Sequence, residues 1–140
     1  MQVQFFFLST NISLKNRNKL KLFIATLFSS EKKCLLHLNY IFCSDEFLLQ
    51  INRDSLKHDY YTDIITFDLS DSKKQVVGEI YISLDRVRDN AQSLSVTLEE
   101  ELHRVIFHGA LHLCNYKDKT PRDANTMRRL EDKYLKKYFK

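Results

Sequence analysis

The sequence has few of the residues that interrupt regular structure or bridge it covalently: two glycines, one proline and three cysteines in 140 residues. Together with a hydrophobic fraction of 44%, the scarcity of glycine and proline indicates a compact, ordered protein with one substantial core. The sequence contains no internal repeat, low-complexity tract or linker. We therefore expect one domain that spans residues 1–140.

The cysteines, Cys34, Cys43 and Cys114, form no C-x-x-C pair and no even disulfide set. A reduced, cytoplasmic protein is the simpler interpretation. The apolar run at residues 5–8 is too short for a secretory signal and lacks a basic leader. No run approaches the length that spans a bilayer, so we expect no membrane association.

Hydrophobic periodicity predicts an α+β fold with about four strands in a mixed sheet packed against helices. We expect strands at residues 3–8, 35–42, 62–69 and 76–82, with a turn at residues 71–74. A helix is expected at residues 16–29, and Ser44 can cap a short helix that runs through residues 49–52. Ser83, Thr97 and Thr120 stand where the last three helices begin.

The stretch from His108 to Asp118 carries the strongest functional signal. An α-helix turns once in about 3.6 residues, so His108 and His112 share a face and both imidazoles can reach one point. Asn115 suits the left-handed position that ends many helices, and a short loop then returns Asp118 toward the pair. Two imidazoles and a carboxylate are typical ligands of catalytic zinc, with a fourth position left for water.

The alternative is that the histidines are ordinary core or surface residues, as two histidines at helical spacing often are. The order of the features favours the metal interpretation, because a ligand pair, a helix end and a third ligand follow one another closely. Gly109 stands where H-E-x-x-H proteases place their glutamate, which argues against a peptidase.

Motifs in three parts of the chain occur together in one known family. Residues 108–118 read H-G-A-L-H-L-C-N-Y-K-D, residues 62–67 read T-D-I-I-T-F and residues 78–83 read G-E-I-Y-I-S. The chain therefore resembles the YbeY family of endoribonucleases, whose corresponding motifs are H-G-x-L-H-L-x-G-Y-D-H, T-D-V-L-S-F and G-D-I-x-I-S. Asn52, Glu101, Met127 and Glu131 also fall where that family places such residues.

The resemblance implies a YbeY-type hydrolase domain with a zincin-like metal-bearing helix and single-strand-specific endoribonuclease activity. One divalent metal, usually zinc, would be bound by His108, His112 and Asp118 and would activate water to attack a phosphodiester. The implied role is 16S rRNA 3′ end maturation and ribosome quality control in the cytoplasm. The implied partners are rRNA and the small ribosomal subunit.

Two positions depart from the family pattern. Asp118 replaces the third histidine, which shifts metal preference toward harder ions. Leu56 stands where the family usually has an arginine that serves RNA phosphate or catalysis, and leucine makes no bidentate phosphate contact. Neighbouring Lys57 or His58 are candidate substitutes for RNA binding. Tyr116 is a candidate for base stacking, with packing against the helix end as the alternative.

The residue that moves protons is left open, with Glu79 and Asp63 as candidates that have structural explanations too. His103, nine residues before His112, should point to the opposite helix face and bind no metal. Glu101 lies about two turns from His108, so we expect it on the helix surface or behind the ligands.

The formal charge of +4 is compatible with RNA contact but describes association rather than fold. Basic residues that could neutralise phosphate are Lys73, Lys74, Arg122, Arg129, Lys133, Lys136 and Lys140. Two further hypotheses stay open. The chain could be a ribosome-assembly RNA-binding protein with a structural metal and little nuclease activity, or a hydrolase of another substrate such as a peptide bond.

Overall fold

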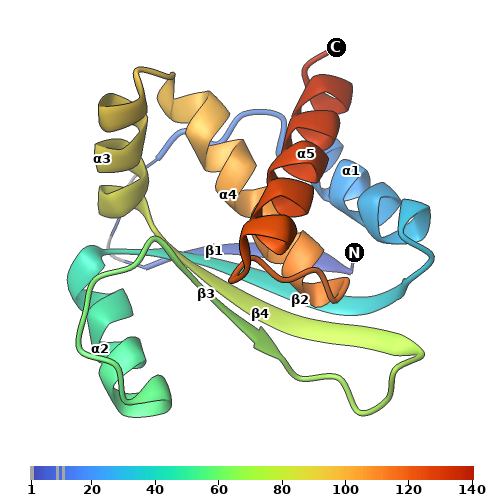
Figure 1. The fold of residues 1–140 in the computed structure, drawn as a ribbon, viewed down its shortest axis with the longest axis horizontal. Coiled ribbons are helices and arrows are strands. Elements are labelled where there is room, and N and C mark those ends of the chain that lie inside the picture. Colours follow the sequence, from blue (N-terminus) through green and yellow to red (C-terminus); the bar gives the residue numbers. More distant parts are fainter. Residues whose placement is uncertain (1, 9, 11) are drawn as a thin grey trace.

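A four-stranded mixed sheet forms the centre of the molecule (Figure 1), in a computed structural model that describes residues 2–8, 10 and 12–140. Its strands are β1 (Val3–Phe7), β2 (Cys34–Cys43), β3 (Ile64–Asp68) and β4 (Gln75–Ser83), in the spatial order β1-β2-β4-β3. β2 pairs in parallel with both β1 and β4, whereas β3 runs antiparallel to β4. The expected mixed α+β sheet is confirmed.

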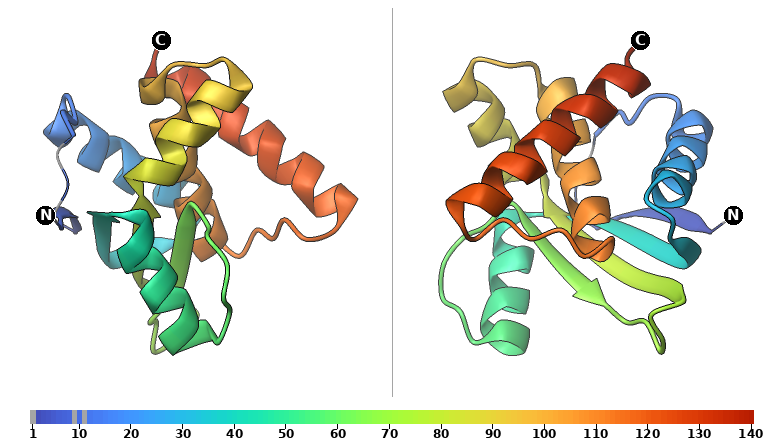
Figure 2. Two further views of the ribbon diagram at one scale, coloured as in Figure 1. Left: turned by 90° about the vertical axis from the view of Figure 1, so that its left-hand side faces the viewer. Right: turned by 45° about the vertical axis from the view of Figure 1, so that its right-hand side comes forward.

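Helices cover the two faces of this sheet unequally. The five helices of the described chain are α1 (Arg17–Ser30), α2 (Asp45–Leu56), α3 (Leu84–Leu94), α4 (Leu98–Leu113) and α5 (Pro121–Tyr138). Figures 1 and 2 show α1, α3, α4 and α5 on one side of the sheet and α2 on the other. Among the described residues, no helix is long and apolar enough to cross a membrane.

The apolar residues form two cores that follow this layering. The main core lies between the sheet and the four-helix side, where Tyr40, Phe42, Ile80 and Phe107 are fully buried. A smaller cluster under α2 is formed by Cys43, Leu48 and Ile65, with Ile51, Phe67 and Tyr81 packed against it. Neighbouring residues of a strand point to opposite faces, so β4 contributes Ile80 to one core and Tyr81 to the other.

The predicted helix starts are confirmed by side-chain caps. The hydroxyls of Ser44, Ser83, Thr97 and Thr120 each accept a hydrogen bond from the backbone N–H three residues later. Such caps satisfy N–H groups that the helix itself leaves unpaired. The helix after Ser44 is longer than expected and extends to Leu56, where Lys57 ends it in the left-handed conformation.

Candidate metal centre

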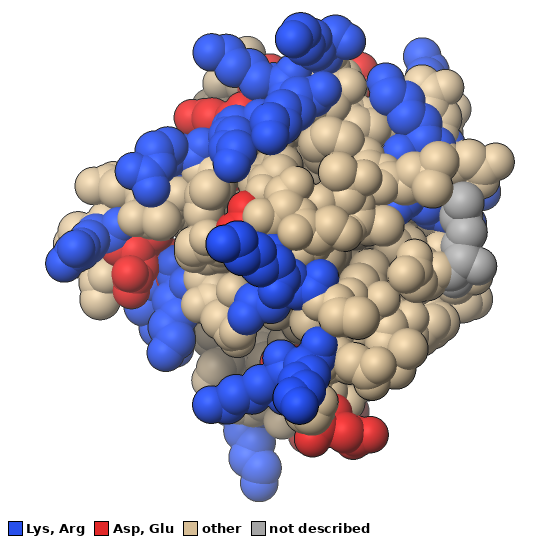
Figure 3. Space-filling view, turned by 90° about the vertical axis from the view of Figure 1, so that its right-hand side faces the viewer, with Lys and Arg blue, Asp and Glu red and all other residues tan. Residues whose placement is uncertain are grey.

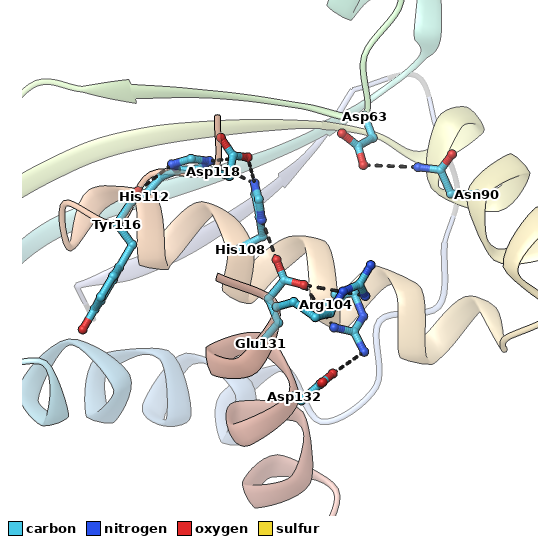
Figure 4. A network of polar contacts seen from close by, with 10 residues as sticks. Asp63, Asn90, Arg104, His108, His112, Tyr116, Asp118, Glu131 and Asp132 are labelled. Carbon is cyan, nitrogen blue, oxygen red and sulfur yellow. Dashed lines mark hydrogen bonds and ion pairs between the residues drawn. The ribbon is translucent and has the colours of Figure 1, made fainter. Parts of the chain in front are cut away.

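The sequence around the two histidines folds as their spacing predicts. His108 and His112 lie one turn apart on α4, which ends at Leu113. Asn115 adopts a φ of 74°, the left-handed conformation expected of it. The N–H of Tyr116 then donates to the carbonyl of Leu111, which turns the chain back toward the helix. The loop that follows carries Asp118 to the two imidazoles (Figure 4).

Three side-chain atoms converge at this corner. The two Nε2 atoms of His108 and His112 lie 2.9 Å apart, and Oδ2 of Asp118 lies 3.2 Å and 3.3 Å from them. Ligands of a tetrahedral zinc ion with bonds of about 2.0–2.1 Å are about 3.3 Å apart, so the spacing fits such an ion. Within the described residues, no other group of three His, Cys, Asp or Glu ligand atoms is as close.

The outer nitrogens of the two rings determine which atoms face the centre. Nδ1 of His108 lies 2.6 Å from Oε2 of Glu131, and Nδ1 of His112 lies 2.9 Å from the carbonyl oxygen of Tyr116. Both partners are acceptors, so each neutral ring donates its Nδ1–H outward and leaves the Nε2 lone pair inward. Two lone pairs and a carboxylate oxygen then face one another. A cation at their centre would relieve this repulsion, and the donor set therefore fits a divalent metal.

An ion-pair network supports His108 from the side of α5. Glu131 is 6% exposed, and its Oε1 atom accepts from Nη1 of Arg104 at 3.0 Å. Arg104 also donates from Nη2 to Asp132 at 2.8 Å. Burial lowers the pKa of His108, but the hydrogen bond and negative charge of Glu131, with Asp118 and Asp63, raise it more. The sequence placed Glu131 only as a family match and gave no sign of its contact with His108.

A second group of acidic side chains lies beside the network. Asp63 accepts a hydrogen bond from Nδ2 of Asn90 at 3.2 Å, and burial raises the pKa of its carboxyl group (Figure 4). Glu101 is 5% exposed and its pKa is also raised, first by burial and then by the charge of Asp63. Asp63, Glu101 and Glu131 share a cavity of about 270 Å³. The possibility that Glu101 lies on the helix surface was wrong, because it faces this cavity.

A groove of about 540 Å³ opens in front of the three converging atoms. It is lined by His108, His112 and Asp118, by the loop that follows α2, and by β3 residues. Leu56 lines it and is 41% exposed, so the position where an arginine was expected does face the groove. Asn52, which is 1% exposed, shapes the loop because its Nδ2 atom donates to the carbonyl of Tyr60 at 2.9 Å.

The predicted RNA contacts lie in different places. His58 lines the groove and stacks on Tyr60 with ring centroids 5.2 Å apart. Lys57 is exposed at the end of α2 and is not part of the groove wall. Tyr116 directs its ring away from the histidines, and its hydroxyl donates to Glu31 at 2.6 Å (Figure 4). This placement favours packing over base stacking for Tyr116.

The two remaining candidates, His103 and Glu79, lie on other faces of their elements than the metal corner. His103 stacks on Tyr138 with ring centroids 5.2 Å apart and faces away from the metal corner, as the helical spacing predicted. Cys114 is buried within the main core. Glu79 was a wrong candidate for proton transfer, because strand alternation turns it to the other sheet face, where its Oε1 accepts from the hydroxyl of Tyr81.

Comparisons with known proteins agree with the resemblance. The family described as Endoribonuclease YbeY matches residues 8–139. A protein from Cytophaga hutchinsonii named Endoribonuclease YbeY is 53% identical over 131 residues, covering 94% of this chain and 92% of its own. One of the same name from Flavobacterium johnsoniae is 44% identical over 126 residues, 90% of each chain. The solution structure of TM1509 from Thermotoga maritima superimposes with a TM-score of 0.61 at 26% identity, over 97% of this chain and 89% of that one.

Proposed function

The chain belongs to the YbeY family of endoribonucleases, and from that premise we propose that it is a metal-dependent endoribonuclease that hydrolyses RNA phosphodiester bonds. The observation that carries the proposal is the convergence of two imidazole lone pairs and the Asp118 carboxylate at the wall of an open groove. We propose single-stranded rRNA as substrate, in 16S 3′ end maturation and ribosome quality control. The small ribosomal subunit and the cytoplasm are the partner and compartment that this role requires.

His108, His112 and Asp118 are the proposed ligands of one divalent metal per chain, with zinc as the expected ion. When bound, such an ion supplies a Lewis acid that lowers the pKa of water and stabilises negative charge on phosphate. Glu131 and the carbonyl of Tyr116 orient the two rings, so that neither Nε2 atom turns away. Asp63 lines the groove and the adjoining cavity, which makes its carboxyl group the candidate for moving a proton.

The proposed path of RNA follows the groove and a neighbouring hollow of about 430 Å³. The two depressions share Asp68 and Leu113 as walls, and Lys33 and Lys73 line the hollow. Figure 3 shows basic side chains spread over the face that lies on the right in Figure 1. Lysines along such a path bind a strand by neutralising phosphates, independently of sequence. His58 in the groove and Lys57 at the end of α2 are the proposed contacts beside the metal.

Cleavage of single-stranded and structured RNA by native protein, His112→Ala and Asp118→Ala tests this function. We expect metal-dependent cleavage of the single strand, loss of cleavage on chelation, and loss in both variants while circular dichroism shows a retained fold. Cleavage that persists in both variants and after chelation would exclude the proposed mechanism. Identical purification of all three proteins controls for contaminating nucleases.

The exposed Leu56 in the groove favours a second candidate, a ribosome-assembly protein that binds RNA around a structural metal. Leucine offers no hydrogen bond to a phosphate, whereas arginine offers two parallel ones. In that case metal removal would lower the melting temperature, and the native metal-loaded protein would not cleave RNA. Peptide hydrolysis is disfavoured, because Gly109 packs against Ile64 and Ile80 and leaves no room for a glutamate.

A further inference from the structure

Glu131 contacts His108 on the side opposite the proposed metal ligand atom. Its Oε2 atom lies 2.6 Å from Nδ1 of His108, which is a short charge-assisted hydrogen bond. The two residues come from different helices, α4 and α5, and Glu131 is 6% exposed. A buried carboxylate at this distance fixes both the tautomer and the rotation of the imidazole ring.

Arg104 holds the carboxylate in place from one turn earlier on α4. Its Nη1 donates to Oε1 of Glu131 at 3.0 Å, so the two oxygens of Glu131 serve different partners. The guanidinium side chain is 15% exposed, and the Glu131 side chain is 8% exposed. Ion pairs at this depth are weakly screened by solvent. Arginine therefore keeps Glu131 directed at His108, and Asp132 holds the other guanidinium nitrogen.

The two histidines are supported unequally. His112 has a peptide carbonyl behind it at 2.9 Å, whereas His108 has a full negative charge at 2.6 Å. A carboxylate makes the ring a more basic ligand than a neutral carbonyl does, because it stabilises the positive charge that the ring acquires on binding a cation. His108 is thus the ligand whose strength depends on a second side chain.

We infer that Glu131, fixed by Arg104, is a positioning residue that sets the metal affinity of the site through Nδ1 of His108. The inference rests on the proposed metal centre. It adds that a residue with no access to the metal controls how tightly the metal is bound. Such supporting carboxylates change metal affinity by about 10–100-fold in other proteins.

Zinc affinity of Glu131→Gln, measured by competition with a chromophoric chelator, tests the inference. We expect affinity about 10–100-fold below that of the native chain. Asp132→Asn is the matched control, because it removes the same charge from the next residue but keeps an oxygen that can accept from Arg104, and Asp132 does not contact His108. We expect this variant to bind zinc like the native chain. The visible spectrum of the Co²⁺-loaded proteins reports ligand geometry, and we expect it to change only in Glu131→Gln.

Three results would overturn the inference. Native zinc affinity in a folded Glu131→Gln variant would show that Glu131 acts only in packing. Equal losses in Glu131→Gln and Asp132→Asn would show an effect of net charge rather than of the hydrogen bond. If Glu131→Gln does not fold, Arg104→Lys decides, because a lysine ammonium cannot fix Oε1 of Glu131 as the planar arginine fork does. Native zinc affinity of Arg104→Lys would overturn the inference, and reduced affinity would support it. A native chain that binds no metal would overturn the proposed function as well.

Discussion

Replacing Gly109 with alanine tests how closely α4 must approach the sheet. The added Cβ would lie 2.9 Å from Cδ1 of both Ile64 and Ile80, whereas carbon atoms in unstrained contact are about 3.5–4.0 Å apart. Alanine favours a helix by about 1 kcal/mol relative to glycine, and overpacking a core costs about 1–3 kcal/mol. Ile80 is fully buried and has little room to move. We therefore expect a net loss of about 1 kcal/mol in the free energy of unfolding.

Urea unfolding of the metal-free protein, followed by circular dichroism, measures this difference. Gly109→Ser extends the series, because the larger serine side chain should lower the free energy of unfolding more than alanine does. Zinc affinity should fall in the same order, since a shift of α4 away from the sheet moves His108 and His112. A Gly109→Ala variant that is more stable than the native chain by the full helix propensity would show that α4 has spare room against the sheet, contrary to the expected clash.

Three further predictions concern residues outside the ligand set. Burial lowers the pKa of His103, so the unfolded chain takes up the proton first as pH falls below about 6.5, and stability decreases. His103→Phe should remove the contribution of His103 to the pH dependence of stability. That contribution is at most about 1.4 kcal/mol per pH unit in the free energy of unfolding, measured with urea. Asn52→Ala should lower the free energy of unfolding by about 1–3 kcal/mol, because it removes the buried donor to the carbonyl of Tyr60. It should also speed proteolysis within residues 57–63. Leu56→Arg should tighten single-stranded RNA binding and steepen its dependence on log salt by about 0.7, one phosphate contact.

Each of these has an outcome that would contradict it. An unchanged pH profile in His103→Phe would mean that His103 is protonated equally in the folded and unfolded chain. Equal proteolysis in Asn52→Ala would mean that the loop is ordered by other contacts. If Leu56→Arg binds RNA with the affinity and salt dependence of the native chain, the bound strand lies away from the groove.

Local signals were sufficient to predict most of the fold and the convergence of His108, His112 and Asp118. Runs of apolar, branched and aromatic residues indicated the strands, and hydroxyl residues indicated the helix starts. The spacing of His108 and His112 and the left-handed preference of Asn115 depend on a few neighbouring residues, so the sequence alone predicted how Asp118 returns to the histidines.

Contacts between distant elements could not be predicted in this way. Glu131 is 23 residues from His108, and Glu31 is 85 residues from Tyr116, so both pairs depend on how helices pack. The periodicity of α5 predicted its buried face but not the residue opposite each side chain. Strand alternation could have excluded Glu79, because Ile80 beside it belongs to the main core.

Calorimetric titration of the chelator-treated chain with Zn²⁺, beside a His108→Ala/His112→Ala double variant, tests the metal centre most directly. We expect one ion bound per native chain and none in the double variant. No binding by the native chain, or equal binding by the double variant, would contradict it.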